Sequence, residues 1–485
     1  MASPRLLSNL LLLIPLSAFA QIDEAIVEHS STLPSLTESA WNNPALLSKK
    51  YNSSLSSVAG SFYNSDKERF GEFKADSYMK LKSVTISAHA LYNNGAKHNV
   101  RFCENVDIDK IYPYLTYDAI GGNLNLERYA FGGEVGVKIS DRWDAGGFIS
   151  YNAGLFYRNV DPRPRIVTGN FKLGAGGAYS LNDNYKVGLY LNFDKYKQSC
   201  GITFMSELGA SKIYHLTGLG SHYNRFAGLG NSTYYNGNSF GGAVTLLPST
   251  EGIYANVSAH KGKMNLILED LNKLPMSKID TRDLSIEAGY KSKIWGVTAF
   301  TDILRKHGYE NIFGDAASGQ YPQIGTVAMH IINQNIYGVK GTVDLPIKHT
   351  VLSVTPAVGY SHYKEIYRDP KRLLKCDNLT SSVEMKAISV IANRVIVRGG
   401  IKYNLVSPVS HDIENVTTNN DDLTNYISIL QEGYETATGT CHNFSASIGA
   451  DLMICSNKYV IGIDATYARD KLYGNHSLFS ASFKF

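Results

Sequence analysis

Apolar and polar residues alternate at every second position through most of the chain. Residues 131–140 (FGGEVGVKIS) show this pattern, and residues 143–157 (WDAGGFISYNAGLFY) continue it after a short turn. A period of two predicts β-strands with one apolar and one polar face. Segments of about 10 such residues are typical of strands that cross a membrane at a tilt.

The pattern predicts eighteen strands. The number falls to 16 or 14 if the early segments or residues 325–345 fold differently, so the expected range is 14 to 18. The strands are expected at residues 54–64, 70–80, 82–92, 128–140, 143–157, 169–181, 184–196, 238–247, 252–264, 282–291, 294–304, 334–345, 349–366, 380–391, 394–406, 443–454, 458–469 and 476–485.

Short and long connections alternate along these strands. Short turns follow every second strand, as at residues 140–142 and 182–183, whereas the longest connections are residues 93–127, 197–237, 305–333 and 407–442. A transmembrane barrel has short periplasmic turns, long extracellular loops and an even number of strands. A β-sandwich has no reason to sort its connections in this way. We therefore expect an all-β fold, a closed transmembrane antiparallel β-barrel of about 18 strands.

The two faces of the predicted strands differ as a barrel requires. In residues 169–181 one face carries Phe171, Leu173 and Tyr179, whereas the other carries Lys172 and Ser180. A Lys or Arg facing lipid at the middle of the bilayer costs about 2–4 kcal/mol. The apolar face is therefore expected to face lipid and the charged face to line the lumen.

The chain ends in a strict alternation, SLFSASFKF. This pattern places Phe479, Ala481, Phe483 and Phe485 toward lipid and the intervening Ser480, Ser482 and Lys484 toward the lumen. The stretch resembles the C-terminal β-signal of bacterial outer-membrane proteins, which ends in an aromatic residue. The resemblance implies two partners, the barrel insertion machinery and outer-membrane lipid.

The first twenty residues (MASPRLLSNLLLLIPLSAFA) read as a Sec signal peptide cleaved after Ala20, with an uncleaved anchor as the alternative. We expect residues 21–50 to form a periplasmic or lumen-plugging segment and residues 51–485 to form the barrel. No run of about 20 apolar residues follows the first twenty, which excludes a helical membrane protein. The formal charge of +4 gives no reason to expect nucleic acid as a partner.

The N-terminal segment carries a short resemblance to known barrels. Asn43, Pro44 and Ala45, after Trp41, resemble the N-terminal Asn-Pro-Ala stretch of FadL-like barrels and of PorV-type barrels of type IX secretion. In the long-chain fatty acid transporters this segment enters the lumen as a hatch, which makes Trp41, Asn43 and Pro44 plug candidates here. The alternative is a periplasmic linker that ends in a Pro turn. The whole pattern also resembles an uncharacterised outer-membrane barrel family of Bacteroidota, which implies an outer-membrane location.

Several charged residues are predicted to project into the lumen. A basic strip there would attract an anionic solute, because lumen residues tune selectivity. The alternative is an internal ladder of salt bridges without a role toward solutes. The candidates are Arg394, Arg398, Lys402, Glu384, Lys386, Asp451, Glu134 and Lys138, together with Asp144 and Glu287.

Two predicted loops contain residues that could form binding sites. Residues 215–238 contain Gly-Leu-Gly twice, but no Lys-Ser/Thr follows, so a flexible polar surface loop is expected rather than a phosphate cradle. Residues 417–422 (TTNNDD) lack the spaced ligands of a calcium loop, so a solvated turn is expected. We expect no metal site and no cofactor.

The five cysteines give no firm framework. No pair has metal-ligand spacing, and an odd number in an exported protein leaves at least one thiol unpaired. Disulfides within the loops remain an open alternative. The cysteines are Cys103, Cys200, Cys376, Cys441 and Cys455.

The sequence gives no reason to expect an enzyme. Phospholipase barrels place a His and a Ser two residues apart on an outward face, but His476 and Ser477 are adjacent and therefore lie on opposite faces. His260 and Ser258 are two apart, yet they are predicted to point into the lumen. The expected function is a passive transport channel or receptor for a small or amphipathic solute. The alternative is an accessory barrel subunit of a TonB-dependent uptake complex or of a type IX secretion complex.

Overall fold

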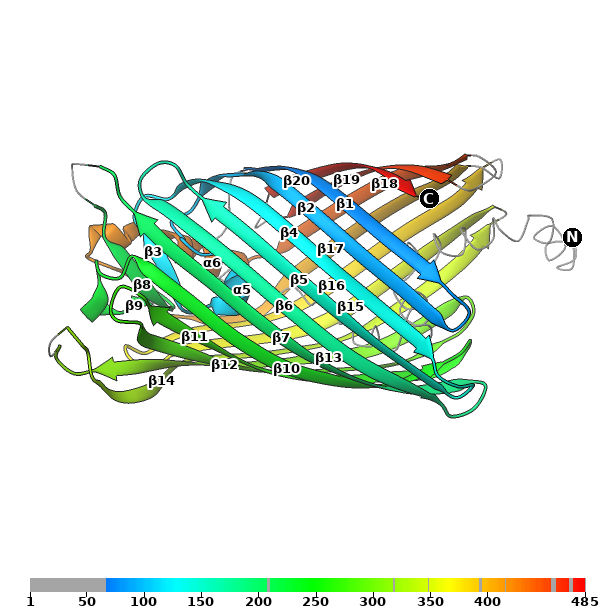
Figure 1. Cartoon of the computed structure of the whole chain (residues 1–485), viewed down its shortest axis with the longest axis horizontal. Coiled ribbons are helices and arrows are strands. Elements are labelled where there is room, and N and C mark those ends of the chain that lie inside the picture. Colours follow the sequence, from blue (N-terminus) through cyan, green and yellow to red (C-terminus); the bar gives the residue numbers. More distant parts are fainter. Residues whose placement is uncertain are drawn as a thin grey trace, which may run out of the picture.

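A computed structural model of the chain describes residues 67–206, 210–316, 319–347, 349–391, 395–414, 416–454, 459–470 and 474–484. One antiparallel sheet dominates it, and Figure 1 shows this sheet curved into a barrel. Its seventeen strands are β1 (Lys67–Lys80), β2 (Val84–Val100), β4 (Gly122–Lys138), β5 (Trp143–Tyr157), β6 (Arg163–Ser180), β7 (Tyr185–Thr203), β10 (Ser232–Pro248), β11 (Gly252–Leu268), β12 (Leu274–Lys291), β13 (Trp295–Phe313), β14 (Gln323–Ile347), β15 (Thr350–Tyr367), β16 (Arg372–Ile391), β17 (Val395–Ile413), β18 (Cys441–Ile454), β19 (Tyr459–Asp470) and β20 (Gly474–Lys484).

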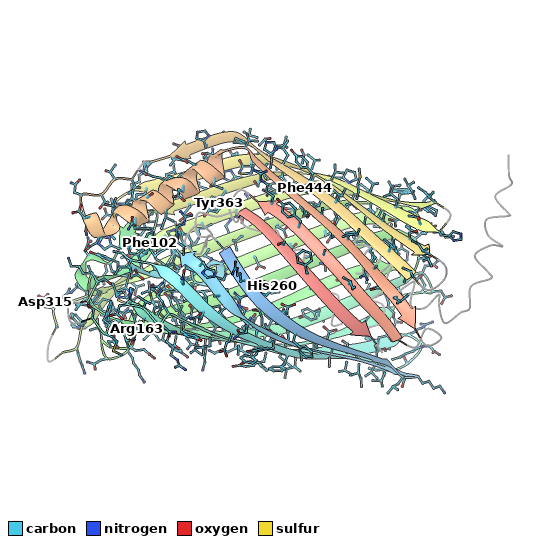
Figure 2. The ribbon with its side chains drawn as sticks, turned by 90° about the horizontal axis from the view of Figure 1, so that it is seen from above. Phe102, Arg163, His260, Asp315, Tyr363 and Phe444 are labelled. Atoms are coloured by element: carbon cyan, nitrogen blue, oxygen red, sulfur yellow. The ribbon has the colours of Figure 1, made fainter. Side chains whose placement is uncertain are left out.

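Each strand of this sheet pairs with the next one along the chain, so the sheet is a continuous meander. The order skips only three short strands, because β2 pairs with β4 and β7 pairs with β10. The edge strands β1 and β20 lie on the same side of the barrel, and Figure 2 shows open space between their ribbons (Figures 1 and 2). No hydrogen-bonded pairing of β1 with β20 occurs among the described residues. Since both are odd-numbered members of a seventeen-stranded meander, they run in the same direction.

The remaining elements lie in three long connections. The first connection carries α5 (Ile108–Ile111) and β3 (Leu115–Asp118). The second carries β8 (Ile213–Gly218), β9 (Ser221–His222) and the 3-10 helix η3 (Asn224–Phe226). The third carries the 3-10 helix η4 (Asp421–Leu423) and α6 (Thr424–Thr438). Figure 1 shows these elements gathered at the end of the barrel opposite the short turns.

Seventeen of the eighteen predicted strands are present, and the predicted strand at residues 54–64 lies outside the described residues. The strands are longer than the sequence pattern indicated. For example, β13 has 19 residues where eleven were predicted, and β14 has 25. Strand pairing continues beyond the alternating stretch because the inner faces of these extensions pack against the long connections. The connections are correspondingly shorter, at residues 101–121, 204–231, 314–322 and 414–440.

The predicted division between the two faces is confirmed. On β7, Leu189 and Leu191 project outward and are 54% and 60% exposed, whereas Lys186 and Tyr190 project inward and are buried. Aromatic side chains pair on the outer face near the short turns, with ring centroids of Trp143 and Tyr179 4.8 Å apart. This arrangement matches the apolar band and aromatic girdle of a membrane barrel. Among the described residues, no helix is both long and apolar enough to cross a membrane.

Candidate functional site

The three long connections fold into the barrel end from which they arise and form a packed body there. Strands β3, β8 and β9 make a small antiparallel sheet, with Leu115 opposite Leu216. Helix α6 lies beside it in both views of the chain (Figures 1 and 2). We call residues 101–121, 210–231 and 416–440 the loop plug. Its apolar residues share one hydrophobic cluster with inward residues of β10 to β16.

Fully buried tyrosines dominate the interior of the loop plug. The ring of Tyr117 contacts those of Tyr214 and Tyr426, with centroids 6.3 Å and 5.7 Å apart. Tyr235, on the wall strand β10, donates a hydrogen bond to the carbonyl of Tyr114 at 3.0 Å. A buried tyrosine combines a large apolar ring with a hydroxyl that needs a partner. The loop plug is therefore a packed core with internal polar contacts.

The prediction of a flexible polar surface loop at residues 215–238 is wrong. Leu216 and Phe226 are almost completely buried in the shared hydrophobic cluster. The Gly-Leu-Gly repeats provide tight turns, because Gly218 and Gly220 adopt φ of 95° and 80° and Gly230 adopts 75°. Glycine enters this region of backbone conformation without steric cost. The solvated turn predicted at residues 417–422 holds in large part, since most of these residues are exposed before η4 begins.

One residue of this loop, His215 on β8, is buried and electrically neutral at pH 7. Its Nε2 atom lies 2.9 Å from the carbonyl oxygen of Leu229, to which it donates. Burial lowers the pKa of His215 to about 4, because desolvation disfavours the charged imidazolium. The imidazole therefore serves as a fixed hydrogen-bond donor that holds the loop together.

A buried carboxylate on the wall connects to the loop plug. Glu365 on β15 accepts hydrogen bonds from Tyr112 of the loop plug and, at 2.6 Å, from the wall residue Tyr363. His330 on β14 places Nε2 2.7 Å from the same carboxylate, and its ring meets that of Tyr112 edge-on at 5.6 Å. His330 and Glu365 have no exposed side-chain surface. This group, with Tyr363 labelled in Figure 2, forms the first polar latch between plug and wall.

Two further wall side chains bind the backbone of the same connection. Lys306 on β13 donates to the carbonyls of Asp109 at 2.8 Å and Tyr112 at 3.2 Å. Gln198 on β7 accepts from the amide of Val106 and donates to its carbonyl, both at 2.9 Å. Together they satisfy plug backbone groups that would otherwise be buried without partners. The first connection is therefore held by side chains from several strands.

The second latch is a buried charge cluster. Arg158, just after β5, places Nη2 3.1 Å from Glu104 Oε1 and Nη1 3.5 Å from Asp118 Oδ2. Both carboxylates belong to the first connection and have no exposed side-chain surface. Burial raises the pKa of Glu104 well above its usual range, and the neighbouring Asp118 raises it further, whereas Arg158 opposes the shift. One guanidinium thus faces two carboxyl groups, which favours a proton on Glu104.

The second and third connections meet at a glycine. Gly220 donates its amide hydrogen to the Tyr426 hydroxyl at 2.9 Å, and Arg372 of β16 donates to the carbonyl of Leu219 at 2.7 Å. A Cβ atom on Gly220 would lie 2.6 Å from Arg372 Nη1 and 2.7 Å from Val416 Cγ1. The contact between α6, β16 and this loop therefore requires glycine.

The lumen charges predicted on β16 to β18 lie on the inner face but are largely paired. Arg398 Nη1 is 2.5 Å from Asp451 Oδ2, and Lys386 Nζ is 2.9 Å from Glu384 Oε1. Lys402 is exposed and lies opposite Glu384 in the strand register. These pairs match the internal salt-bridge ladder that the sequence left open. Arg394 lies outside the described residues.

The predicted lumen charges on β4 also have hydrogen-bond or ion-pair partners. Glu134 accepts a hydrogen bond from Ser87 of the neighbouring strand β2 at 3.1 Å. Lys138 forms an ion pair with Asp141 at 3.1 Å, although both side chains are largely exposed. On β12, Glu287 pairs with Lys340 at 3.4 Å.

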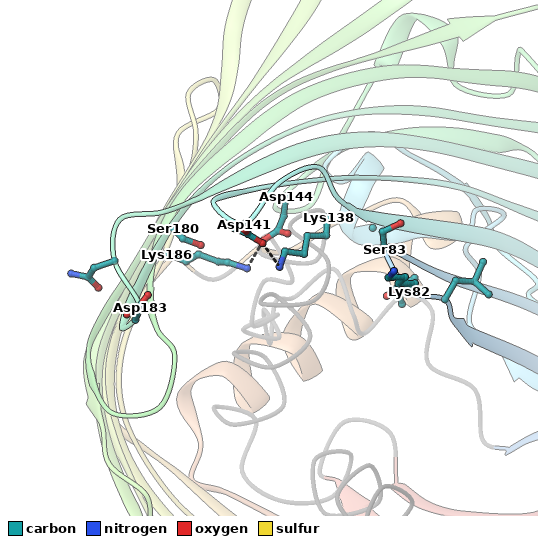
Figure 3. Close-up of a pocket in the computed structure, with 12 residues that line it drawn as sticks. Lys82, Ser83, Lys138, Asp141, Asp144, Ser180, Asp183 and Lys186 are labelled. Carbon is teal, nitrogen blue, oxygen red and sulfur yellow. Dashed lines mark hydrogen bonds and ion pairs between the residues drawn. The ribbon is translucent and has the colours of Figure 1, made fainter.

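A pocket of about 390 Å³ opens at the short-turn end, far from the loop plug (Figure 3). Lys186 and Asp144 form an ion pair in its wall, and Lys138 and Asp141 form another beside it. Both charge signs are therefore present, and two of the three lysines that line the pocket, Lys138 and Lys186, lie in these ion pairs. The pocket adds a polar mouth to the inner face rather than a selective anion site.

The predicted C-terminal signal lies on the last described strand. Phe479 is 80% exposed on β20, which agrees with a lipid-facing position. Ala481 and Phe483 occupy the alternate positions that follow, opposite Ile463 and Ile461 of β19. Phe485 lies outside the described residues, so its role as a β-signal stays a prediction.

Two other groups of predicted residues can be placed. The plug candidates Trp41, Asn43 and Pro44 lie outside the described residues. Cys103, Cys200 and Cys376 are buried and free, Cys441 is buried beside the carbonyl oxygens of Thr436 and Gly439, and Cys455 lies outside the described residues. Among the described residues, no group of three or more His, Cys, Asp or Glu side chains is placed to hold a metal ion.

A family model described as "Family of unknown function (DUF6850)" matches residues 44–485. The chain belongs to the DUF6850 family. Its match covers the barrel and the loop plug together, so both are part of one family unit. A comparison with curated protein sequences finds no match.

A comparison with solved structures finds similarity to this DUF6850 chain at low sequence identity and low TM-score. The ferric preacinetobactin receptor BauA of Acinetobacter baumannii is 10% identical with a TM-score of 0.43, over 86% of this chain and 65% of the receptor. The siderophore receptor PiuA of the same species is 8% identical with a TM-score of 0.42, over 87% and 75%. The ferric enterobactin receptor PfeA of Pseudomonas aeruginosa is 8% identical with a TM-score of 0.39, over 86% and 78%. Scores at this level say nothing about what the DUF6850 chain binds.

Proposed function

We propose that this protein is an outer-membrane barrel that passes a small or amphipathic solute, with the loop plug as the gate at its long-loop end. The observation that carries the proposal is that buried polar contacts attach the loop plug to the barrel wall. Polar latches, built on Glu365 and Arg158, join it to the wall at sites 0–6% exposed. Interactions of this kind have discrete formed and broken states, as a gate requires.

The membrane location rests on the outer surface. Large apolar side chains are exposed on the outward face of strand after strand, including Phe131, Ile149, Leu191, Phe240 and Ile253. A water-soluble protein rarely exposes a contiguous apolar surface larger than a few hundred Å². The short turns then face the periplasm and the loop plug faces the outside, as the alternation of connection lengths predicts.

Conductance tests the gate directly. We expect wild-type protein in a planar bilayer to show a small or intermittent conductance, because the loop plug fills one end. Glu365→Gln keeps the shape of the side chain but removes its charge, so it weakens the bonds from Tyr112 and His330 and should increase the open time. Tyr129→Phe, at an exposed outer position, is the matched control. A correctly folded Glu365→Gln protein that shows no conductance in the bilayer would contradict the proposal.

Residues 21–50 provide a separate test of the predicted hatch. If this segment enters the lumen, its deletion should raise the conductance of the otherwise intact barrel. An unchanged conductance would exclude the hatch and leave the loop plug as the gate. The same measurement on the Glu365→Gln protein separates the two contributions.

A second function, an accessory subunit of a TonB-dependent or secretion complex, is favoured by one observation. Val160 and Met205 are exposed apolar residues on neighbouring loops. Asp161 holds these loops together by accepting from the amides of Met205 and Ser206, each at 2.7 Å. Mass spectrometry of the tagged protein, gently purified from its own membrane, would find a stoichiometric protein partner in this case. A lone barrel with a co-purified small molecule would support transport instead.

A further inference from the structure

The outer wall carries a concentration of basic residues just beyond the apolar band, on the long-loop side. On β7, Leu189 and Leu191 face outward, and the same face continues through Phe193 to Lys195 and Lys197. Successive residues of one face are two positions apart, so apolar and basic groups follow each other directly along the wall. The charge therefore begins where the apolar surface ends.

The same transition occurs on the neighbouring strands. On β11 the outward face runs from Ile253 and Val257 to Lys261 and Lys263, and both lysines are exposed. On β12 it runs from the exposed Ile286 to the exposed Arg282. The strand register places these positions at the same height, because Lys261 lies opposite Arg282.

Three cations form a row across three strands. Lys261 is the direct cross-strand neighbour of Arg282, and Arg282 is the direct neighbour of Arg305 on β13. Like charges directly opposite one another destabilise a sheet. Lys364 on β15 also lies directly opposite Lys375 on β16, although Lys375 forms an ion pair with Asp377 at 3.6 Å. Folding alone gives no reason to align cations in this way, which points to an anionic ligand.

Few acidic groups neutralise the row. Asp280 on β12 is on the same face and forms an ion pair with Lys278 at 3.0 Å. Neutral amides flank the other end, where Lys195 donates to Asn236 at 2.5 Å and to Asn238 at 2.8 Å. The row of Lys261, Arg282 and Arg305 thus presents a net positive surface beside the membrane band.

We propose that this row binds the phosphate groups of a phosphorylated glycolipid in the outer leaflet, with the acyl chains against the apolar band below. Three strands span two inter-strand spacings, about 10 Å, which exceeds one phosphate and suits a headgroup with several phosphates. Arginine and lysine form strong charge-assisted hydrogen bonds with phosphate oxygens. The binding site rests on the proposed membrane orientation and is independent of whether the barrel conducts.

The test measures lipid binding by the full chain purified in detergent. Native mass spectrometry would follow added lipid A with two phosphates, the same lipid without phosphates, and phosphatidylglycerol. We expect wild-type protein to retain the diphosphorylated lipid A and to release the other two. The triple variant Lys261→Gln, Arg282→Gln, Arg305→Gln should bind the diphosphorylated lipid A at least about tenfold more weakly, because it loses three charge-assisted contacts. The control Lys273→Gln, Lys293→Gln, Lys371→Gln removes the same charge from exposed turns and should bind normally.

The outcomes separate specific binding from general attraction and from misfolding. Equal binding by the wild-type protein and the triple variant would overturn the proposal. Equal retention of phosphatidylglycerol would also overturn it, since any anionic lipid would then suffice. Resistance to urea in lipid-free detergent should stay the same or rise in the triple variant, because a repulsive row is removed. If that variant fails to fold, the single change Arg282→Gln at the centre of the row must lower lipid A retention, and unchanged retention would overturn the proposal.

Discussion

Tyr112, in the first long connection, donates a hydrogen bond to Glu365 on β15, although 253 residues separate them in the chain. The same carboxylate accepts from Tyr363 at 2.6 Å and contacts His330 at 2.7 Å. A residue of the first long connection thus donates one of the hydrogen bonds to this wall carboxylate. The wall residues alone would leave the carboxylate with one hydrogen-bond donor fewer. The position of the plug and the stability of this part of the barrel are therefore coupled.

Tyr112→Phe tests this coupling. The change removes one hydroxyl from a buried, charge-assisted hydrogen bond, which costs roughly 1.5–3 kcal/mol. We expect the free energy of unfolding in urea, measured in detergent micelles, to fall by that amount. Tyr129→Phe removes a hydroxyl that bonds Glu127 on the outer surface at 3.2 Å and should change it by less than about 0.5 kcal/mol. Equal effects of the two changes would show that the latch adds no stability of its own.

The wall could be predicted from sequence because its signal is local and repeated. Outward residues such as Leu189 and Leu191 recur at every second position, and each strand repeats the pattern independently. The loop plug has no such signal. Residues 111–117 (IYPYLTY) are strongly apolar but too short to show a period, and α6 follows a polar stretch. Burial of these segments arises only from contacts between connections far apart in the chain.

For the lumen charges, the sequence predicts the face of the strand but not the partner of each side chain. Alternation alone placed Arg398, Glu384 and Asp451 on the inner face. Their partners depend on strand register and side-chain reach, and neither is fixed by a period of two. The pairing of Arg398 with Asp451 crosses between β17 and β18 with an offset along the ladder. A basic strip in the sequence thus becomes an ion-pair ladder in the fold.

Arg398→Ala tests whether this pair supports the wall. The change would remove the Arg398 cation from the buried Asp451 carboxylate, and the loss of one partner from a buried ion pair typically costs about 3–5 kcal/mol. Lys138→Ala removes one partner of an exposed ion pair on the same inner face and should cost no more than about 1 kcal/mol. The free energies of unfolding of both variants in urea give the comparison. A small loss for Arg398→Ala would mean that water or another group solvates Asp451.

Glu104→Gln tests the charge cluster around Arg158 by its pH dependence. The pKa of Glu104 is raised in the folded protein, so the fold retains a proton that the unfolded chain releases near its ordinary value of about 4.3. The stability contributed by this group is complete below that value and is lost as the pH rises through the folded pKa. The variant carries a permanently neutral side chain, so it should exceed wild type in stability at neutral pH and match it near about pH 4. Unfolding in urea across this range measures the difference.

The exposed Glu435 on α6 supplies the control for that experiment. Glu435→Gln removes the same charge without changing the buried cluster, so its stability should follow the wild-type curve. A Glu104→Gln protein that becomes less stable than wild type as the pH rises would show that ionised Glu104 is the form that the fold prefers. The cluster would then be an ordinary salt bridge.

Gly220→Ala tests the packing between the second connection, β16 and α6. The alanine would adopt φ near 80° and would place Cβ 2.6 Å from Arg372 Nη1 and 2.7 Å from Val416 Cγ1. Left-handed backbone costs roughly 1–2 kcal/mol for a residue with a Cβ atom, and overpacking adds about 1–3 kcal/mol. Gly319→Ala shares the left-handed backbone at φ 74° but has no atom within 4 Å of its Cβ position. Gly319→Ala should therefore show only the cost of the left-handed backbone. The difference between the losses of unfolding free energy in the two variants then gives the cost of the contact with Arg372 and Val416. If the difference is near zero, Arg372 and Val416 move aside freely, and this part of the loop plug is not tightly held.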